Sequence, residues 1–251
     1  MRALPDPEAV CERILGEAGQ IGLPIDLRTV CSLWPTLHVA EEDLDKDGYL
    51  IPLGVHGAEL LVRRQDPPMR KKFTLAHELG HWVLANLQDD QVVFDKGNGL
   101  ALTSRNEHSR QTPEEIWCNR FAAALLIPRS ELTRYLSESN SQEIADLVAT
   151  GDSKFGVSRE AFLTRVAKVA NMTVLQVLDT SEDFRISRSF VSSVHRSLDL
   201  TLVVATVLEE ITKQRAQRHS MNVGALDVSA TQIDTSSNGS LWLLCLSGSA
   251  S

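Results

Sequence analysis

Residues 73–87, which read FTLAHELGHWVLANL, constrain this chain most strongly because they place a histidine pair inside an apolar, helix-forming run. His77 and His81 are four residues apart, so on a helix their imidazoles lie on the same face. Two neutral imidazoles and one further protein ligand can hold Zn²⁺ tetrahedrally and leave a fourth position open. Glu78 can serve as a general base beside such a metal without being a ligand. The spacing predicts a metal site on a buried helix.

The setting of the HELGH pentad carries much of this prediction, because the bare pattern also occurs by chance in unrelated chains. Apolar residues flank the pentad on both sides and favour a helix that lies in a core. Gly80 is a weak helix former inside this run. We expect it to leave room for a substrate or for a neighbouring helix.

Composition excludes several classes of protein. The chain has 251 residues and a net charge of −8, which argues against a broad nucleic-acid-binding surface. No apolar stretch is long enough for a signal peptide or a membrane span, so we expect a cytoplasmic protein without membrane contact. The cysteines are widely separated, and we interpret them as reduced, buried thiols rather than as a zinc site or a nucleophile. They are Cys11, Cys31, Cys118 and Cys245.

A third metal ligand is expected from a second buried helix, which Thr112 and Pro113 begin and Pro128 ends. Glu114 and Glu115 lie in its first turn. The residue pattern alone allows either one to be the metal ligand, and either one would also interact favourably with the helix dipole. His108, in the polar segment 88–112, is an alternative ligand, although a loop imidazole is poorly preorganised. His38 and His56 have no spacing that pairs them with the pentad, so we expect them in strands or on the surface.

The remaining chain indicates an α+β fold. Periodicity and turn residues predict the elements before the pentad as two helices followed by three strands. These are helices at 7–19 and 24–33 and strands at 37–40, 49–52 and 58–62. After Pro128 we predict a helix at 142–148, a turn at 151–156 and a second helix that Ser158 caps. Beyond residue 180 the pattern is strand-like at 184–194, 221–233 and 241–246, and ambiguous at 200–218.

Two motifs together resemble the ImmA/IrrE family of zinc metallopeptidases. HELGH is preceded by F-T-L-A, and E-x-x-x-N-x-F-A-A-x-L-L-x-P follows at 115–128, with Ile127 in place of the family's usual Met. The resemblance implies that Glu115, four residues before Asn119, is the third ligand. A downstream segment, FGVSREAFLTR at 155–165, resembles the family's helix-turn-helix-like unit. The resemblance covers about residues 10 to 178.

The resemblance also implies a domain organisation. We expect a zincin-like minimal metallopeptidase core at 1–135, with a small antiparallel or mixed sheet packed on helices and an active-site HExxH helix. A helix-turn-helix-like helical unit would follow at 136–180. A small mixed region at 181–251 would have a regulatory role, complete the core or mediate association.

The function implied is that of a zinc-dependent endopeptidase in which His77, His81 and Glu115 hold Zn²⁺ and Glu78 is the catalytic base. Mn²⁺ is an alternative occupant, because a His₂Glu site is not strictly selective. The implied substrate is a helix-turn-helix transcriptional repressor, whose cleavage would derepress stress-response or mobile-element genes. We expect no direct DNA binding, and the sequence predicts no oligomeric state.

Two other hypotheses remain open at this point. The chain could be a non-catalytic, metal-containing transcriptional regulator or antitoxin-like binding module that acts through residues 155–166. It could also be a metallohydrolase of another bond, since the pentad fixes the activated water and not the bond that water attacks.

Overall fold

The computed structural model describes residues 4–20, 22–88, 112–138, 144–180, 183–214, 217–236 and 239–248. Most of the predicted polar segment 88–112, including His108, therefore lies outside the described residues. The chain divides into two compact units. Unit 1 comprises Met1–Pro128 and Phe155–Ser158, and unit 2 comprises Arg129–Lys154 and Arg159–Ser251. The predicted domain boundaries at residues 135 and 180 stay a prediction. Helix α5, Arg129–Ser137, belongs to unit 2.

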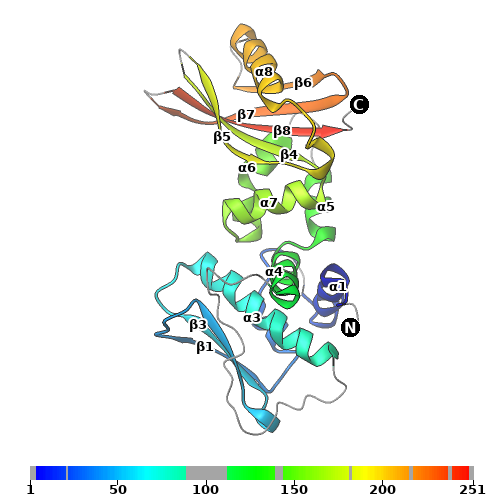
Figure 1. Ribbon diagram of the computed structural model, residues 1–251, viewed down its shortest axis with the longest axis vertical. Coiled ribbons are helices and arrows are strands. Elements are labelled where there is room, and N and C mark those ends of the chain that lie inside the picture. The colour runs from blue at the N-terminus through cyan, green and yellow to red at the C-terminus, as the bar shows by residue number, and fades with distance from the viewer. Residues whose placement is uncertain are drawn as a thin grey trace. The chain divides into compact units, whose positions relative to one another are not determined.

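Unit 1 is a small mixed sheet with helices packed against it (Figure 1). Its elements in chain order are α1 Pro7–Glu17, α2 Leu27–Cys31, β1 Leu37–Glu42, β2 Gly48–Pro52, the 3-10 helix Gly54–His56, β3 Ala58–Arg63, α3 Pro68–Gln88 and α4 Pro113–Leu126. The strand order is β1-β3-β2, with β1 parallel and β2 antiparallel to β3. The elements predicted from the sequence before the pentad are thus present, with shifted ends.

Helix α4 lies between α3 and α1, and each neighbour contacts it through a particular group. On the α3 side, a Cβ added at Gly80 would lie 3.1 Å from Phe121 Cδ1, so the glycine allows the two helices to approach closely. On the other side, the Cys11 thiol donates to the carbonyl of Phe121. Trp117 Nε1 donates to the carbonyl of Pro5 at 2.7 Å. The room that Gly80 leaves is filled by a helix, one of the two predicted outcomes.

The beginning of α3 is tied to the sheet by ion pairs. Asp47, before β2, accepts from Arg63 at 2.9 Å and from Arg70 at 2.7 Å. Asp66 pairs with Arg63 at 2.8 Å and lies 3.7 Å from Arg70. Both carboxylates are largely buried, so these contacts are better protected from solvent screening than surface pairs. They also offset the unfavourable basic charge at a helix N-terminus.

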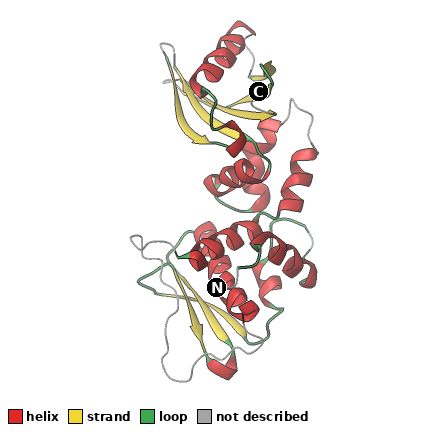
Figure 2. Cartoon of the chain, turned by 45° about the vertical axis from the view of Figure 1, so that its right-hand side comes forward, coloured by secondary structure: helices red, strands yellow, loops and turns green. Residues whose placement is uncertain are grey.

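Unit 2 is an antiparallel sheet with helices on both faces (Figures 1 and 2). Its elements are α5, α6 Ile144–Phe155, α7 Arg159–Val169, β4 Thr173–Asp179, β5 Phe184–Phe190, the 3-10 helix Ser193–His195, α8 Leu200–Gln214, β6 Arg218–Val223, β7 Leu226–Ser236 and β8 Gly239–Gly248. The strand order is β5-β4-β8-β7-β6. One face packs against Val204 and Val207 of α8. On β7, Thr231 donates to Asp146 of α6 at 2.6 Å.

Three sequence predictions for this region need correction. Helix α6 continues through Gly151 to Phe155, so the predicted turn at 151–156 reduces to Gly156, which has φ +63. Gly151 lies within this helix, where a Cβ would lie 2.0 Å from the Phe162 ring, so the glycine permits close packing and does not end the helix. Strand β4 was not predicted, and the ambiguous segment 200–218 is mainly α8.

Helix α7, the second helix of the predicted helix-turn-helix-like unit, is largely buried. Phe162, Leu163 and Val166 face the interior, and its exposed residues are the acidic Glu160 and the basic Lys168. The described residues of this helix therefore include one exposed basic side chain, near its C-terminal end, and form no basic face. Phe155 and Val157, between α6 and α7, are buried, and Lys72 of α3 donates to the carbonyls of Phe155 and Gly156.

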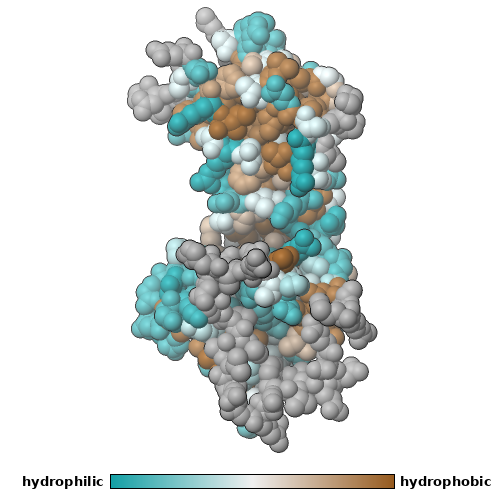
Figure 3. All heavy atoms as spheres, viewed as in Figure 1, coloured by the Kyte–Doolittle hydropathy of each residue, from teal (hydrophilic) through white to brown (hydrophobic). Residues whose placement is uncertain are grey.

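The surface differs between the units in Figure 3. In this view hydrophilic side chains gather at one edge of unit 1, whereas hydrophobic surface gathers over the strands of unit 2. No helix among the described residues combines the length and the apolar character needed to cross a membrane.

Candidate metal centre

Helix α3 brings the two predicted histidines together near its middle. His77 and His81 are largely buried, and their Nε2 atoms lie 3.2 Å apart. Their rings meet edge to face with centroids 4.9 Å apart. The i, i+4 spacing therefore has the consequence expected from the sequence: both imidazoles present the same nitrogen to one point.

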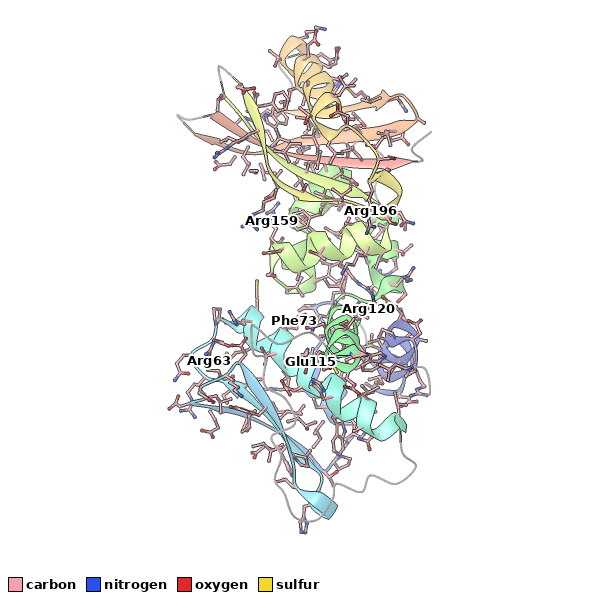
Figure 4. All side chains as sticks on the ribbon, in the orientation of Figure 1. Arg63, Phe73, Glu115, Arg120, Arg159 and Arg196 are labelled. Atoms are coloured by element: carbon pink, nitrogen blue, oxygen red, sulfur yellow. The ribbon has the colours of Figure 1, made fainter. Side chains whose placement is uncertain are left out.

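The first turn of α4 supplies the carboxylate that completes this cluster. Thr112 caps the helix by accepting from the backbone N–H of Glu115 at 3.2 Å, which fixes that turn. Glu115 Oε2 lies 3.2 Å from His77 Nε2, and Oε1 lies 3.3 Å from His81 Nε2. Glu114 points to solvent. The structure thus brings together His77, His81 and Glu115 and leaves Glu114 out; Figure 4 shows Glu115 between α3 and α4.

The separations fit a metal ion. A tetrahedral zinc site with bonds of about 2.0–2.1 Å places its ligand atoms about 3.3–3.4 Å apart. The three measured separations of 3.2, 3.2 and 3.3 Å are close to those edges. Two imidazole nitrogens and one carboxylate oxygen are also the donor set of a catalytic zinc site with an open fourth position. The residues present therefore fit the group.

Electrostatics favour the neutral, ligand-competent form of His81. Burial and the neighbouring His77 lower the pKa of His81 to about 4, although Glu115 acts in the opposite direction. Nδ1 of His77 is buried and has no hydrogen-bond partner among the described residues. The pKa of the Cys118 thiol on α4 is raised by burial and then by the charges of Glu115, Glu78 and Glu114.

Glu78, the predicted catalytic base, is buried with an exposed fraction of 4%. A Cβ at Gly48 of β2 would lie 3.3 Å from Glu78 Cγ and 2.5 Å from Thr74 Cγ2, so the glycine allows strand β2 to approach this face of α3. Sequence reasoning missed Gly48 because the contact joins distant parts of the chain. The sequence carries no local signal for this approach, since Gly48 lies well before the pentad in the chain.

The other candidate residues lie apart from the cluster. His38 and His56 are exposed, as predicted. Among the described residues, no other group of three or more His, Cys, Asp or Glu side chains brings its possible ligand atoms within 4.8 Å of one another. All four cysteines are buried free thiols, in agreement with the sequence-based interpretation.

Comparisons with known proteins place the chain in a family. The family model described as the IrrE N-terminal-like domain, Peptidase_M78, matches residues 36–167, more than half of the chain. No curated protein matches the sequence. One solved structure, described as a Mycobacterium tuberculosis transcriptional regulator, is similar with a TM-score of 0.49 and 16% identity; the alignment covers 97% of this chain and 76% of that one.

The family match covers both the HELGH helix and the helix that carries Glu115. It confirms the resemblance inferred from the two motifs. The chain belongs to the family of proteins with an IrrE N-terminal-like domain, the M78 peptidases.

Proposed function

We propose that this protein is a zinc-dependent endopeptidase that cleaves a helix-turn-helix transcriptional repressor and so derepresses stress-response or mobile-element genes. The family is one of metallopeptidases. The observation that carries the catalytic part is the convergence of His77, His81 and Glu115 at 3.2–3.3 Å, with Glu78 buried directly beside the first histidine. The repressor is the substrate class that the family resemblance implies.

Each residue has a separate task in this proposal. The two neutral imidazoles and the Glu115 carboxylate hold the ion, and the capped first turn of α4 keeps that carboxylate in place. Bound zinc supplies a Lewis acid that polarises the scissile carbonyl and lowers the pKa of water. Glu78 orients the attacking water, takes its proton and delivers that proton to the leaving amine. Mn²⁺ is a second ion that the same donor set accepts.

Direct DNA binding is not part of the proposal. The predicted recognition helix, α7, buries Phe162, Leu163 and Val166 and exposes one acidic and one basic residue, Glu160 and Lys168. A major-groove helix needs polar and basic side chains on an exposed face. The low exposure of α7 and the net charge of −8 support a protein-directed function.

The test is a cleavage assay with the full chain and a purified helix-turn-helix repressor encoded beside its gene. Wild type loaded with zinc should cut the repressor, a chelator should stop cleavage, and added zinc should restore it. Glu78→Gln should keep the metal and lower the cleavage rate by about 10²–10⁴-fold, the usual contribution of a general base. Glu114→Gln is the matched control, because Glu114 is a neighbouring but exposed carboxylate, and it should cleave like wild type.

Cleavage by Glu78→Gln at the wild-type rate would contradict the role of Glu78 as the general base. A stable repressor complex with bound metal and no cleavage would contradict the peptidase and favour the binding module.

A further inference from the structure

Unit 1 contains a second concave site, a cavity of about 820 Å³ on the side of α3 away from the metal centre. Helix α2, the segment after it, the inner face of β1 and the first turns of α3 form its walls. Leu75 of α3 lines the cavity, whereas His77 belongs to the metal centre. At 3.6 residues per turn these two positions point about 160° apart around the helix axis. None of the three metal-cluster residues, nor Glu78, lines the cavity.

The cavity has the size and character of a small-molecule site. Pockets that bind small ligands usually have volumes of about 300–1,000 Å³ and mostly apolar walls with a few polar groups. The apolar wall residues here come from α2, the following segment, β1 and α3. They include Leu27, Cys31, Trp34, Leu37, Val39 and Leu75. Val39 is 43% exposed although it lies on the same face of the sheet as the fully buried Leu60, with which it pairs. The core is therefore open at this point.

The acidic groups around the cavity are already engaged. Asp26 caps α2 and accepts from the backbone N–H of Arg28 and from the hydroxyl of Thr29, both at 3.0 Å. Glu41 pairs with Lys71 at 2.6 Å. These two carboxylates therefore leave little acceptor capacity for a cationic ligand.

Two basic side chains that line the cavity, Lys72 and Arg28, form no ion pair with a described residue. Lys72 donates to the backbone carbonyls of Phe155 and Gly156 at 3.5 and 3.4 Å; burial lowers its pKa, and the charge of Asp26 acts in the opposite direction. Arg28 has no ion pair within the described ranges, and neither does Lys72. The ammonium of Lys72 is partly buried, and its two hydrogen bonds are long and go to neutral acceptors, so the more distant charge of Asp26 compensates it only in part. A negatively charged group placed beside it would gain charge-assisted hydrogen bonds.

We propose that this cavity is a binding site for a small organic anion with an apolar body, such as an alkyl or aryl carboxylate. The anionic group is held by Lys72 and Arg28, and the body lies against Trp34, Val39 and Leu75. The occupant contacts the helix that carries both histidines but not the histidines themselves. This site is independent of the peptidase proposal, because its occupancy is measured without any cleavage.

The test uses 8-anilinonaphthalene-1-sulfonate, an aromatic anion, and N-phenyl-1-naphthylamine, which has nearly the same shape without the sulfonate. Both are titrated into the zinc-free and the zinc-loaded full chain by fluorescence. Saturable binding of one sulfonate probe per chain in both forms is expected. Excitation of tryptophan should sensitise the probe, and Trp34→Phe should reduce that signal.

Variants assign the site. Lys72→Met should weaken binding of the sulfonate about 10-fold or more, the usual effect of losing a charged hydrogen bond, and should change binding of the neutral probe much less. Val39→Trp should weaken binding of both probes, because it fills the open side of the cavity. Lys46→Met, which removes a lysine of unit 1 outside the cavity, should bind both probes like wild type.

Retained zinc binding in each variant shows that unit 1 is folded. Arg28→Gln provides a second charge variant should Lys72→Met fail to fold. The proposal is overturned if Val39→Trp and the charge variants bind the sulfonate like wild type. It is equally overturned if sulfonate binding requires zinc.

Discussion

Buried histidines occur in both units, and their surroundings differ in a way that separates a metal site from a structural residue. In unit 2, His195 Nε2 donates to the carbonyl of Gly248 at 3.1 Å. The Thr173 hydroxyl lies 2.9 Å from His195 Nδ1 and accepts from the backbone N–H of Ser192. This network assigns the Nε2–H tautomer and uses both ring nitrogens.

In unit 1, by contrast, the two Nε2 atoms converge on each other and on Glu115. His77 Nδ1 has no hydrogen-bond partner among the described residues. Buried polar groups are normally satisfied within the protein, so a buried cluster that is only partly satisfied points to an external partner. The comparison teaches that the partners of a buried histidine, rather than its burial, indicate its role.

The largest expected effect comes from replacing one buried histidine of each unit with alanine. His81→Ala should lower zinc affinity more than about 100-fold, because loss of a ligand exceeds the 10–100-fold cost of losing an outer partner. His195→Ala should leave zinc affinity unchanged and lower the free energy of unfolding by about 3 kcal/mol, because it leaves buried groups unpaired. Chelator competition and urea unfolding measure the two quantities. A loss of zinc affinity in His195→Ala would break the comparison.

Two helical glycines should respond differently to alanine. In unit 2, Gly151→Ala would place a Cβ within the Phe162 ring's van der Waals radius and should destabilise the protein by about 1–3 kcal/mol. In unit 1, Gly80→Ala meets Phe121 at 3.1 Å, and the gain of about 1 kcal/mol in helix propensity offsets this contact. We expect the free energy of unfolding to change by less than about 1 kcal/mol for Gly80→Ala. Urea unfolding of both variants measures this difference. A larger loss of stability in Gly80→Ala than in Gly151→Ala would contradict the packing described.

The smallest effect concerns Cys31. Burial and then Asp26 raise the pKa of its thiol from 9.0 to about 11. Because the folded-state pKa is the higher one, this group stabilises the protein fully below pH 9, and that contribution is lost as the pH rises towards 11. Wild type should lose about 1 kcal/mol more than Cys31→Ser between pH 8 and pH 10. Parallel pH profiles of unfolding for the two proteins would contradict the stated cause.

The sequence predicted unit 1 better than unit 2 for a physical reason. Local patterns specify the histidine pair, the capped start of α4 and the three short strands. The sequence pattern alone does not distinguish Glu114 from Glu115, because both lie in the first turn of α4, which packs against α3 on one side and α1 on the other. The family motif supplied that choice. The contact of Gly48 with Glu78 joins distant segments and has no local signal.

In unit 2 the fold depends on long-range pairing. Strands β4 and β5 pair, as do β7 and β8, but the two groups are joined by the pairing of β4 with β8, for example of Thr173 with Leu246, across a long stretch of the chain. Gly151 resembled a helix breaker but serves close packing. The strand-like pattern after residue 180 therefore predicted that strands exist without predicting their order.

The most direct test of the central claim is the zinc content and affinity of Glu115→Gln beside Glu114→Gln, measured on the full chain by mass spectrometry of metals and chelator competition. The structure predicts that Glu115→Gln lowers zinc affinity by at least about 10-fold. Glu114→Gln and Glu78→Gln should bind zinc like wild type. Wild-type zinc affinity in Glu115→Gln would contradict the assignment of His77, His81 and Glu115 as the metal centre.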